Sequence, residues 1–326
     1  MNTIQLPQMR VLVTDYCDSK CVYCRPSGEG NLKCKHRHIK YDTATKAAFI
    51  YRECGGTEIK ISGGDPVFWP YLCEYVRYLK NDLRFEHVEL ITRSTKITKI
   101  VDSLIDENLD VLNFSLDTIN PNRYNTITGK KDFNDFIQAI KYCSSRLFCK
   151  INMVVLKDTT VEEVDDMINF CIQNGIRELK LLDYIDDLHE DPRCGKEKQT
   201  EWFQSIYKKL DNISSSKDII FQGGLGHPMS VYSITDKFRA ICKDASKGAW
   251  YSSYCLNCQH YPCHDALMAL RVTPDNSFQL CLLNNRMHWR FNTDNMEEQF
   301  HSILFVFQNA FFMERGANED NSVNSP

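Results

Sequence analysis

The chain has 326 residues, of which 43% are hydrophobic, enough for one large folded domain or two smaller ones. Its formal net charge of −4 gives no general attraction to nucleic acid or to an anionic membrane. No stretch approaches the roughly 18 apolar residues of a membrane-spanning helix, and the N-terminus lacks a secretory signal pattern. We therefore expect a cytoplasmic protein with neither a nucleic-acid nor a membrane partner.

Short strands alternate with helical patterns over the first part of the chain. The expected strands are short apolar or β-branched runs over residues 9–15, 57–62, 87–92, 111–117, 149–156 and 178–184. A helix is expected after Thr160, which can form a capping box with Glu163, and Gly175 is a plausible stop. This alternation predicts a parallel sheet, either open with helices on both faces or curled into a barrel.

The alternation stops after about residue 213. Residues 268–283 read as two short strands around a Pro-Asp-Asn turn, and residues 296–313 read as a closing helix. We therefore expect three parts. They are a core domain over residues 1–213, a C-terminal region over residues 214–315 and a disordered tail over residues 316–326.

Most of the fifteen cysteines are scattered, but Cys17, Cys21 and Cys24 follow the first predicted strand in the pattern Cys-x3-Cys-x2-Cys. Sites in parallel βα sheets form at the carboxyl ends of strands. Three thiolates are one short of the usual four ligands of an iron–sulfur cluster or a structural zinc. A [4Fe–4S] cluster held by three cysteines would leave one iron free for another ligand. A zinc knuckle and three unrelated thiols are the alternatives.

A second motif, "ISGGDP", follows the second predicted strand and contains Gly63, Gly64 and Asp65. Two glycines let the backbone approach a ligand closely and expose N–H groups to it. The alternative is an ordinary strand-to-helix turn, which every βα unit needs.

Together these motifs, with Tyr23 just before the last cysteine, resemble those of the radical S-adenosylmethionine enzymes. In that superfamily S-adenosylmethionine chelates the free iron, and its reductive cleavage gives methionine and a 5′-deoxyadenosyl radical. The resemblance implies that Tyr23 contacts S-adenosylmethionine and that the segment from Gly63 to Asp65 holds its amino group. Asp65 stands where Glu is more usual, and its side chain is one methylene shorter.

The segments at residues 10–24, 59–66, 111–130, 151–158 and 270–282 resemble the GTP 3′,8-cyclase family of molybdenum-cofactor biosynthesis, in the same order. The resemblance implies an α/β fold, an incomplete (β/α)6 TIM-like barrel with a C-terminal extension that carries an auxiliary cluster. It also implies that Thr92 and Ser115, at strand ends, hydrogen-bond S-adenosylmethionine. The alternative is that each hydroxyl caps the start of a helix.

The sequence departs from the cyclase pattern at positions that the resemblance assigns to substrate binding. The resemblance implies substrate contacts for Arg10, Lys60, Lys180 and Arg271. Lys60 and Lys180 stand where the cyclases have arginines, as does Lys130, and lysine lacks the planar fork that matches phosphate. Ala269 replaces a further arginine, and the family's glycine-rich tail is missing. These differences indicate a relative with a changed substrate.

A second cysteine group lies near the C-terminus, with Cys255, Cys258 and Cys263 in the pattern Cys-x2-Cys-x4-Cys and Cys281 further on. Three ligands would leave an open iron on a second [4Fe–4S] cluster, whereas four would close it. A closed cluster suits electron transfer or structural support. Structural zinc and no metal at all are the alternatives.

Two functions are consistent with these features. One is a lyase-like or cyclase-like radical reaction on a nucleotide, analogous to GTP 3′,8-cyclisation. The other is the radical oxidation, epimerisation or cross-linking of a peptide, sugar or natural-product intermediate. Either would need an electron donor such as flavodoxin or ferredoxin. A third alternative, a non-catalytic metal-binding scaffold, would make the intact cysteine motif a relic.

Overall fold

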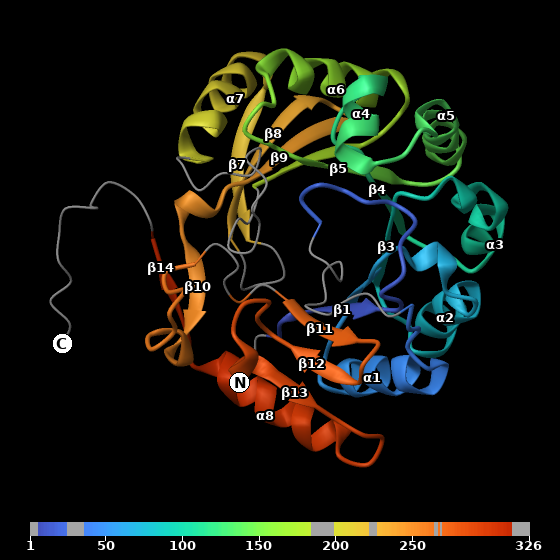
Figure 1. Cartoon of the computed structure of the whole chain (residues 1–326), viewed down its shortest axis with the longest axis vertical. Helices are drawn as coiled ribbons and strands as arrows, with labels where there is room; N and C mark the ends of the chain where they lie inside the picture. Colours follow the sequence, from blue (N-terminus) through green and yellow to red (C-terminus); the bar gives the residue numbers. More distant parts are fainter. Residues whose placement is uncertain are drawn as a thin grey trace, which may run out of the picture.

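The computed structural model describes residues 6–24, 36–183, 199–221, 227–263, 267 and 269–314. In this part of the chain, one twelve-stranded sheet has the order β13-β12-β11-β1-β2-β3-β4-β5-β6-β9-β8-β7. The sheet curls into an open ring with the helices around its outside (Figure 1). This shape confirms the incomplete barrel and excludes the open, doubly wound sheet.

The six strands predicted from the sequence all form and make up the centre of this sheet. They are β1 (Gln8–Leu12), β2 (Glu58–Ser62), β3 (His87–Thr92), β4 (Val111–Ser115), β5 (Cys149–Val154) and β6 (Glu178–Leu182). Each pairs in parallel with the next along the chain. Parallel neighbours need crossover connections, and helices in most of these connections pack on the outside of the ring.

The outer layer consists of short helices. They are α1 (Tyr41–Glu53), α2 (Leu72–Arg77), α3 (Val101–Asp106), α4 (Pro121–Thr128), α5 (Phe133–Ser144), α6 (Val161–Gln173), α7 (Gln199–Ile213) and α8 (Met296–Gln308). The predicted capping box starts α6, because Thr160 Oγ1 accepts from Glu163 N at 3.2 Å and the Glu163 carboxylate accepts from Thr160 N at 3.2 Å. Gly175, at φ +69°, ends the helical segment as predicted.

The chain after α7 extends the same sheet at both edges. Beside β6 lie β9 (Phe238–Lys243), β8 (Pro228–Thr235) and β7 (Ser216–Phe221), and beside β1 lie β11 (Ala269–Thr273), β12 (Ser277–Gln279) and β13 (His288–Arg290). The predicted strand pair over residues 268–283 is confirmed as β11 and β12, with Asn276 in the turn at φ +60°. The boundary predicted at residue 213 coincides with the end of α7 and stays a prediction. The tail over residues 316–326 lies outside the described residues.

The predicted closing helix over residues 296–313 is correct only for α8. Its last residues instead form β14 (Ala310–Met313), which pairs with β10 (Ala249–Ser252) in a separate two-stranded sheet. Aromatic side chains favour strands, and Phe312 lies directly opposite Trp250, with ring centroids 5.5 Å apart. This cross-strand contact explains why the helical pattern stops short.

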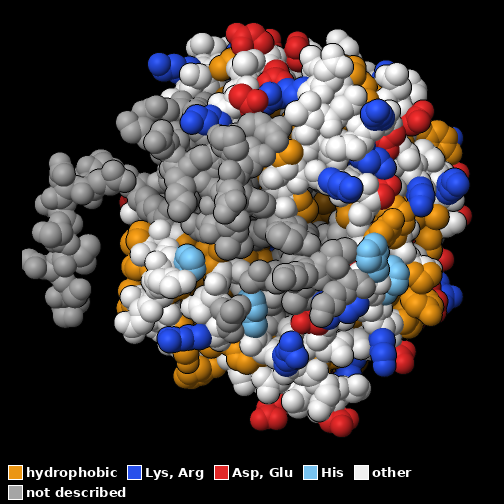
Figure 2. All heavy atoms as spheres, in the orientation of Figure 1, with side chains coloured by type: hydrophobic (Ala, Val, Ile, Leu, Met, Phe, Trp, Pro, Cys, Tyr) orange, Lys and Arg blue, Asp and Glu red, His pale blue; other side chains and the backbone are white. Residues whose placement is uncertain are grey.

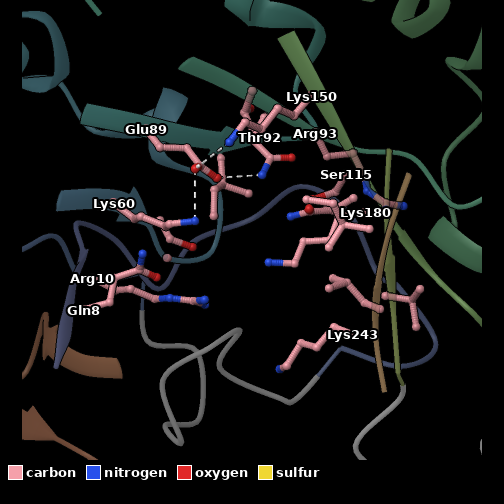
Figure 3. A pocket seen from close by; sticks show the side chains of 18 of the residues that line it. Gln8, Arg10, Lys60, Glu89, Thr92, Arg93, Ser115, Lys150, Lys180 and Lys243 are labelled. Carbon is pink, nitrogen blue, oxygen red and sulfur yellow. Dashed lines mark hydrogen bonds and ion pairs between the residues drawn. The ribbon is translucent and has the colours of Figure 1, made fainter. Parts of the chain in front are cut away.

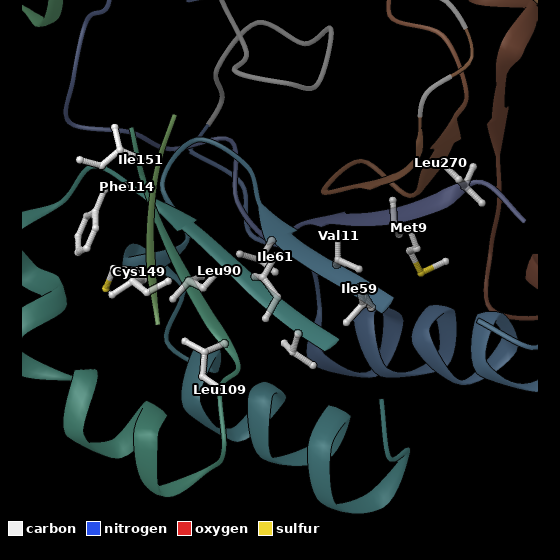
Figure 4. Packing of buried hydrophobic residues seen from close by; sticks show 14 of the residues in the cluster. Met9, Val11, Ile59, Ile61, Leu90, Leu109, Phe114, Cys149, Ile151 and Leu270 are labelled. Carbon is white, nitrogen blue, oxygen red and sulfur yellow. The ribbon is translucent and has the colours of Figure 1, made fainter. Parts of the chain in front are cut away.

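Side chains along the central strands alternate between two environments. Apolar ones such as Val11, Ile59 and Leu90 point toward the helices and form the main core (Figure 4). Polar and charged ones, such as Arg10 and Lys60, point to the inside of the ring. Because successive side chains of a strand point to opposite faces, the concave face of this sheet is polar.

The outer surface mixes charges of both signs. Lysine, arginine, aspartate and glutamate side chains alternate around the face seen in Figure 2. Hydrophobic side chains gather along its left edge, over β10 and β14. Within the described residues, no helix is both long enough and apolar enough to cross a membrane.

The loop after β1, which carries the first three cysteines, lies directly against the loop after β2. Gly64 N donates to Thr14 O at 2.6 Å, and Asp65 N donates to Tyr16 O at 2.7 Å. A Cβ on Gly64 would lie 2.1 Å from Tyr16 O, and one on Gly63 would lie 2.3 Å from Thr14 O. Only glycine permits this approach, which we call the glycine contact.

Gly64→Ala is expected to lower the free energy of unfolding of the apo-protein by about 2–3 kcal/mol, because the new methyl group meets backbone atoms. Denaturant unfolding followed by circular dichroism measures the change. Gly175→Ala is the control. It has open space around its Cβ and only its φ of +69° to oppose the substitution, at about 1 kcal/mol. Equal losses in the two variants would contradict the glycine contact.

Candidate active site

A cavity of about 620 Å³ occupies the inside of the ring. Its wall is built from the inward-facing side chains of the parallel strands, several of which are drawn in Figure 3. Most of the residues predicted for the cofactor and the substrate line it. They are Arg10, Cys17, Cys21, Tyr23, Cys24, Lys60, Gly63, Gly64, Asp65, Thr92, Ser115, Lys180 and Arg271. The structure therefore brings into one space side chains that are spread over more than 250 residues of sequence.

The three cysteines of the first cluster share one wall of this cavity. Cys17 and Cys21 are partly buried, and Cys24 is exposed. Ser19 N donates to Cys17 Sγ at 3.5 Å, while burial raises the pKa of the Cys17 thiol to about 12. No three Cys, His, Asp or Glu side chains converge on one point within the described ranges. The shared wall and the sulfur donors nevertheless fit a [4Fe–4S] cluster.

The end of α4 and Lys130, just after it, also contact the cysteine loop. Lys20 N donates to Thr128 O at 2.8 Å, and Val22 N donates to Ile127 O at 2.9 Å, so the loop pairs with the end of α4. Lys130 Nζ donates to Asp18 Oδ2 at 2.7 Å. Lys130, at one of the positions where the cyclase pattern has an arginine, is not among the cavity-lining residues and instead contacts this loop.

Asp65 and Thr92, both predicted to contact S-adenosylmethionine, contact each other. The buried Asp65 carboxylate accepts from Thr92 Oγ1 at 2.7 Å, from Arg93 N at 2.8 Å and from Val67 N at 3.2 Å. Burial raises the pKa of Asp65 to about 6, although these three donors oppose the increase. The carboxylate thus ties the end of β3 to the glycine contact. Ser115, at the end of β4, lines the same cavity (Figure 3).

Arg93 and Asp117 belong to the site but were not predicted from the sequence. Arg93 Nη2 donates to Asp117 Oδ2 at 2.6 Å and to Tyr23 OH at 2.7 Å. The Tyr23 hydroxyl donates to the same Asp117 oxygen at 2.7 Å. Their positions in the sequence could have indicated a role, because Arg93 lies directly after Thr92 and Asp117 lies two residues after Ser115.

Buried ion pairs form one side of the cavity. Glu89, which is 1% exposed, lies 3.0 Å from Lys60 Nζ and 3.7 Å from Lys150 Nζ. Lys150 also lies 3.6 Å from Glu178, which in turn contacts Arg239 at 2.6 Å. Burial alone would raise the pKa of Glu89, but the two lysines and neighbouring donors hold it well below its usual range. The substrate residue predicted at Lys60 is therefore part of this ion-pair network.

Basic side chains extend into the open part of the cavity from two sides. Lys180 and Lys243 extend from β6 and β9, and Arg10 extends from β1 on the opposite side (Figure 3). Arg271, on β11, is adjacent to Arg10 in the sheet register. Burial, together with the charges of Lys60 and Lys243, lowers the pKa of Lys180 well below its usual range. Lys243 was missed; it lies on the inward side of β9, as do Arg239 and Ile241 at alternate positions of the strand.

The second cysteine group lies beside β10 and β12. Cys255, Cys258 and Cys263 follow β10, and Cys281 follows β12. Cys281 Sγ accepts from Leu283 N and Asn284 N, each at 3.3 Å, and backbone N–H groups of this kind stabilise a thiolate ligand. The described cavity wall includes Leu282 but none of these four cysteines. Their roles as ligands stay predictions.

Comparison with known proteins supports this interpretation of the cavity. The sequence matches the radical SAM superfamily over residues 11–171. It is 26% identical to the GTP 3′,8-cyclase of Petrotoga mobilis, covering 72% of this chain and 76% of that protein. It is also 26% identical to the GTP 3′,8-cyclase of Limosilactobacillus fermentum, covering 85% and 79% respectively.

A solved structure shares the fold. Streptococcus suis SuiB bound to S-adenosylmethionine superposes with a TM-score of 0.61 at 13% identity, over 93% of this chain and 66% of SuiB. The family match coincides with the part of the chain that carries the cysteine loop, the glycine contact and the first five strands. This chain is therefore a radical S-adenosylmethionine enzyme whose sequence is similar to the GTP 3′,8-cyclases over most of its length.

Proposed function

We propose that this enzyme acts on a phosphorylated nucleotide, in a radical reaction analogous to GTP 3′,8-cyclisation. The observation that carries the proposal is the group of basic side chains that lines the same cavity as the cysteine loop. Arg10, Lys180, Lys243 and Arg271 all line this space. Phosphate groups are the anions that such clusters of arginine and lysine bind best.

The residues of the cysteine loop would hold the initiating cofactor. Cys17, Cys21 and Cys24 are the proposed ligands of a [4Fe–4S] cluster, which supplies the electron for cleavage of S-adenosylmethionine. The segment from Gly63 to Asp65 would orient the amino group of S-adenosylmethionine, and three hydroxyl groups at the same rim would contact the rest of it. These hydroxyl groups belong to Tyr23, Thr92 and Ser115. A flavodoxin or ferredoxin in a reducing, cytoplasmic setting would provide the electron.

The proposed substrate contacts lie on the strands around the cavity. Arg10 and Arg271 are neighbours on β1 and β11 and together present two guanidinium groups to a phosphate chain. Lys180 and Lys243 approach from the adjacent strands β6 and β9, where Lys180 lies opposite Ile241 and Lys243 lies opposite Leu182. Lys60 Nζ lies 3.0 Å from Glu89 Oε2, so Lys60 is a weaker candidate for direct contact with the substrate. It would instead contribute positive charge to the wall of the cavity.

Cys255, Cys258, Cys263 and Cys281 would hold a second [4Fe–4S] cluster. Because the described wall of the cavity does not include them, we favour a closed, four-cysteine cluster that transfers electrons or supports the C-terminal region. The backbone donors at Cys281 support its role as a ligand.

The radical modification of a peptide, sugar or natural-product intermediate is the second candidate. Two observations favour it. Ile220 and Phe221 line the cavity and are 38% and 46% exposed, so they offer an apolar contact at its edge. Ala269 also stands where the cyclase pattern has an arginine.

Replacing Cys17, Cys21 and Cys24 together by Ala is expected to abolish the formation of 5′-deoxyadenosine. The same change should reduce iron from about eight to about four atoms per chain after anaerobic reconstitution, because one of two proposed four-iron clusters is lost. Iron analysis and chromatography of the products measure the two effects. Survival of 5′-deoxyadenosine production would contradict the assignment of these ligands.

GTP binding is expected to weaken as pH rises, because the depressed pKa of Lys180 must increase when an anion binds beside it. Complex formation then takes up a proton at pH values between the depressed pKa of Lys180 in the free enzyme and its higher pKa in the complex. Calorimetry in buffers of different ionisation enthalpy measures this uptake. Lys180→Met should remove the uptake and weaken binding by about tenfold, roughly 1.4 kcal/mol.

Lys209→Met is the matched control, because Lys209 is paired with Asp165 on the outer helical layer and does not line the cavity. It should leave GTP binding and proton uptake unchanged. If the reconstituted wild type does not bind GTP at all, the nucleotide proposal is wrong and the second candidate is favoured.

A further inference from the structure

Arg93 connects the three segments that meet at the cysteine loop. Its backbone N–H donates to Asp65 Oδ2 at 2.8 Å, next to the glycine contact. Its Nη2 donates to Asp117 Oδ2 at 2.6 Å and to Tyr23 OH at 2.7 Å. The residue is only 8% exposed, yet it lines the cavity. One side chain therefore links the end of β3, the residues after β4 and the cysteine loop.

Asp117 provides the counter-charge of Arg93. Asp117 uses its second oxygen, Oδ1, to accept from Val154 N on β5 at 3.0 Å. The carboxylate is thus fixed by β5 on one side and by Arg93 and Tyr23 on the other. Arg93 and Asp117 therefore form a fixed pair that contacts the turn between Cys21 and Cys24 through Tyr23.

The second terminal nitrogen of Arg93, Nη1, has no role in this pair. It is buried, and it has no hydrogen-bond partner among the residues that the structure describes. Burying an N–H donor without an acceptor is costly, and such groups in native proteins usually face a ligand or an ion. Tyr23, the Nη2 partner, lies between Cys21 and Cys24 in the sequence. The guanidinium therefore lies beside the turn that carries two of the proposed cluster ligands.

We propose that Arg93 is a positioning residue of the iron–sulfur site, which fixes Tyr23 through Nη2 and places its positive charge, with the buried Nη1, beside the anionic cluster that the cysteine loop would hold. Arg93 would then stabilise the reduced form of the cluster, which carries one more negative charge than the oxidised form. Asp117 would offset part of this effect. The inference rests on the proposed ligation of that cluster by Cys17, Cys21 and Cys24.

The test is the midpoint potential of the S-adenosylmethionine-responsive cluster, measured by redox titration and electron paramagnetic resonance on the reconstituted full chain. Arg93→Gln removes a positive charge and should shift the potential to a more negative value. Asp117→Asn leaves the arginine without its counter-charge and should shift the potential to a more positive value. Net charge and hydrogen bonds near the sulfurs both set such potentials.

Opposite shifts distinguish this role from a merely structural one, because disorder of the loop would move the potential in the same direction in both variants. Arg123, on α4, and Asp158, in the loop between β5 and α6, form a matched control pair that is joined by two hydrogen bonds of 2.7 Å and does not line the cavity. Arg123→Gln and Asp158→Asn should each leave the potential unchanged.

Equal potentials in the wild type and Arg93→Gln, at full iron content, would overturn the proposal. If Arg93→Gln fails to retain its cluster, Asp117→Asn decides, and an unchanged or more negative potential would overturn it. Failure of the underlying ligation is recognised separately. In that case the wild type itself shows no S-adenosylmethionine-responsive signal that depends on the three cysteines.

Discussion

The contact between the backbones of residues 14–16 and 63–65 fixes the geometry on which the active site depends. Two hydrogen bonds, of 2.6 and 2.7 Å, hold the start of the cysteine loop against the loop after β2. Side chains at Gly63 or Gly64 would collide with backbone oxygens of the cysteine loop. The two glycines therefore have a structural role. Because they lack side chains, the cysteine loop and the loop after β2 can lie side by side.

Around this contact, side-chain hydrogen bonds extend the same unit. Asp65 joins it to Thr92 and Arg93, and Arg93 joins it to Tyr23 and Asp117. The ends of four neighbouring strands thus become one polar network at the rim of the cavity. Below the rim, alternation along the strands places charged side chains inside the ring and apolar ones under the helices. Such an interior suits a charged substrate.

Much of the fold could be predicted from the sequence, because many of its elements are marked by local sequence patterns. The six strands, the capping box at Thr160 and the strand pair after residue 268 follow from short patterns of neighbouring residues. The prediction for the segment after α8 was wrong, since its conformation depends on pairing with β10, which lies far away in sequence. Whether the ring is open or curled depends on the twist and pairing of all strands, which no single segment reveals.

The residues of the candidate site were also predicted only in part. Cysteines and glycines with fixed spacing were visible, as were the basic residues shared with the cyclase pattern. Arg93, Asp117, Glu89 and Lys243 were missed, because their importance comes from partners on other strands. The choice of Asp117 as the partner of Arg93 depends on the register between β3, β4 and β5, and requires the fold.

The central claim is that S-adenosylmethionine fills the ligand position that Cys17, Cys21 and Cys24 leave open. Electron–nuclear double resonance on the reduced, reconstituted protein tests it directly, with S-adenosylmethionine carrying 15N in the amino group and 17O in the carboxylate. The account predicts hyperfine coupling of both labels to a cluster that depends on these three cysteines. Bound S-adenosylmethionine without such coupling would contradict it.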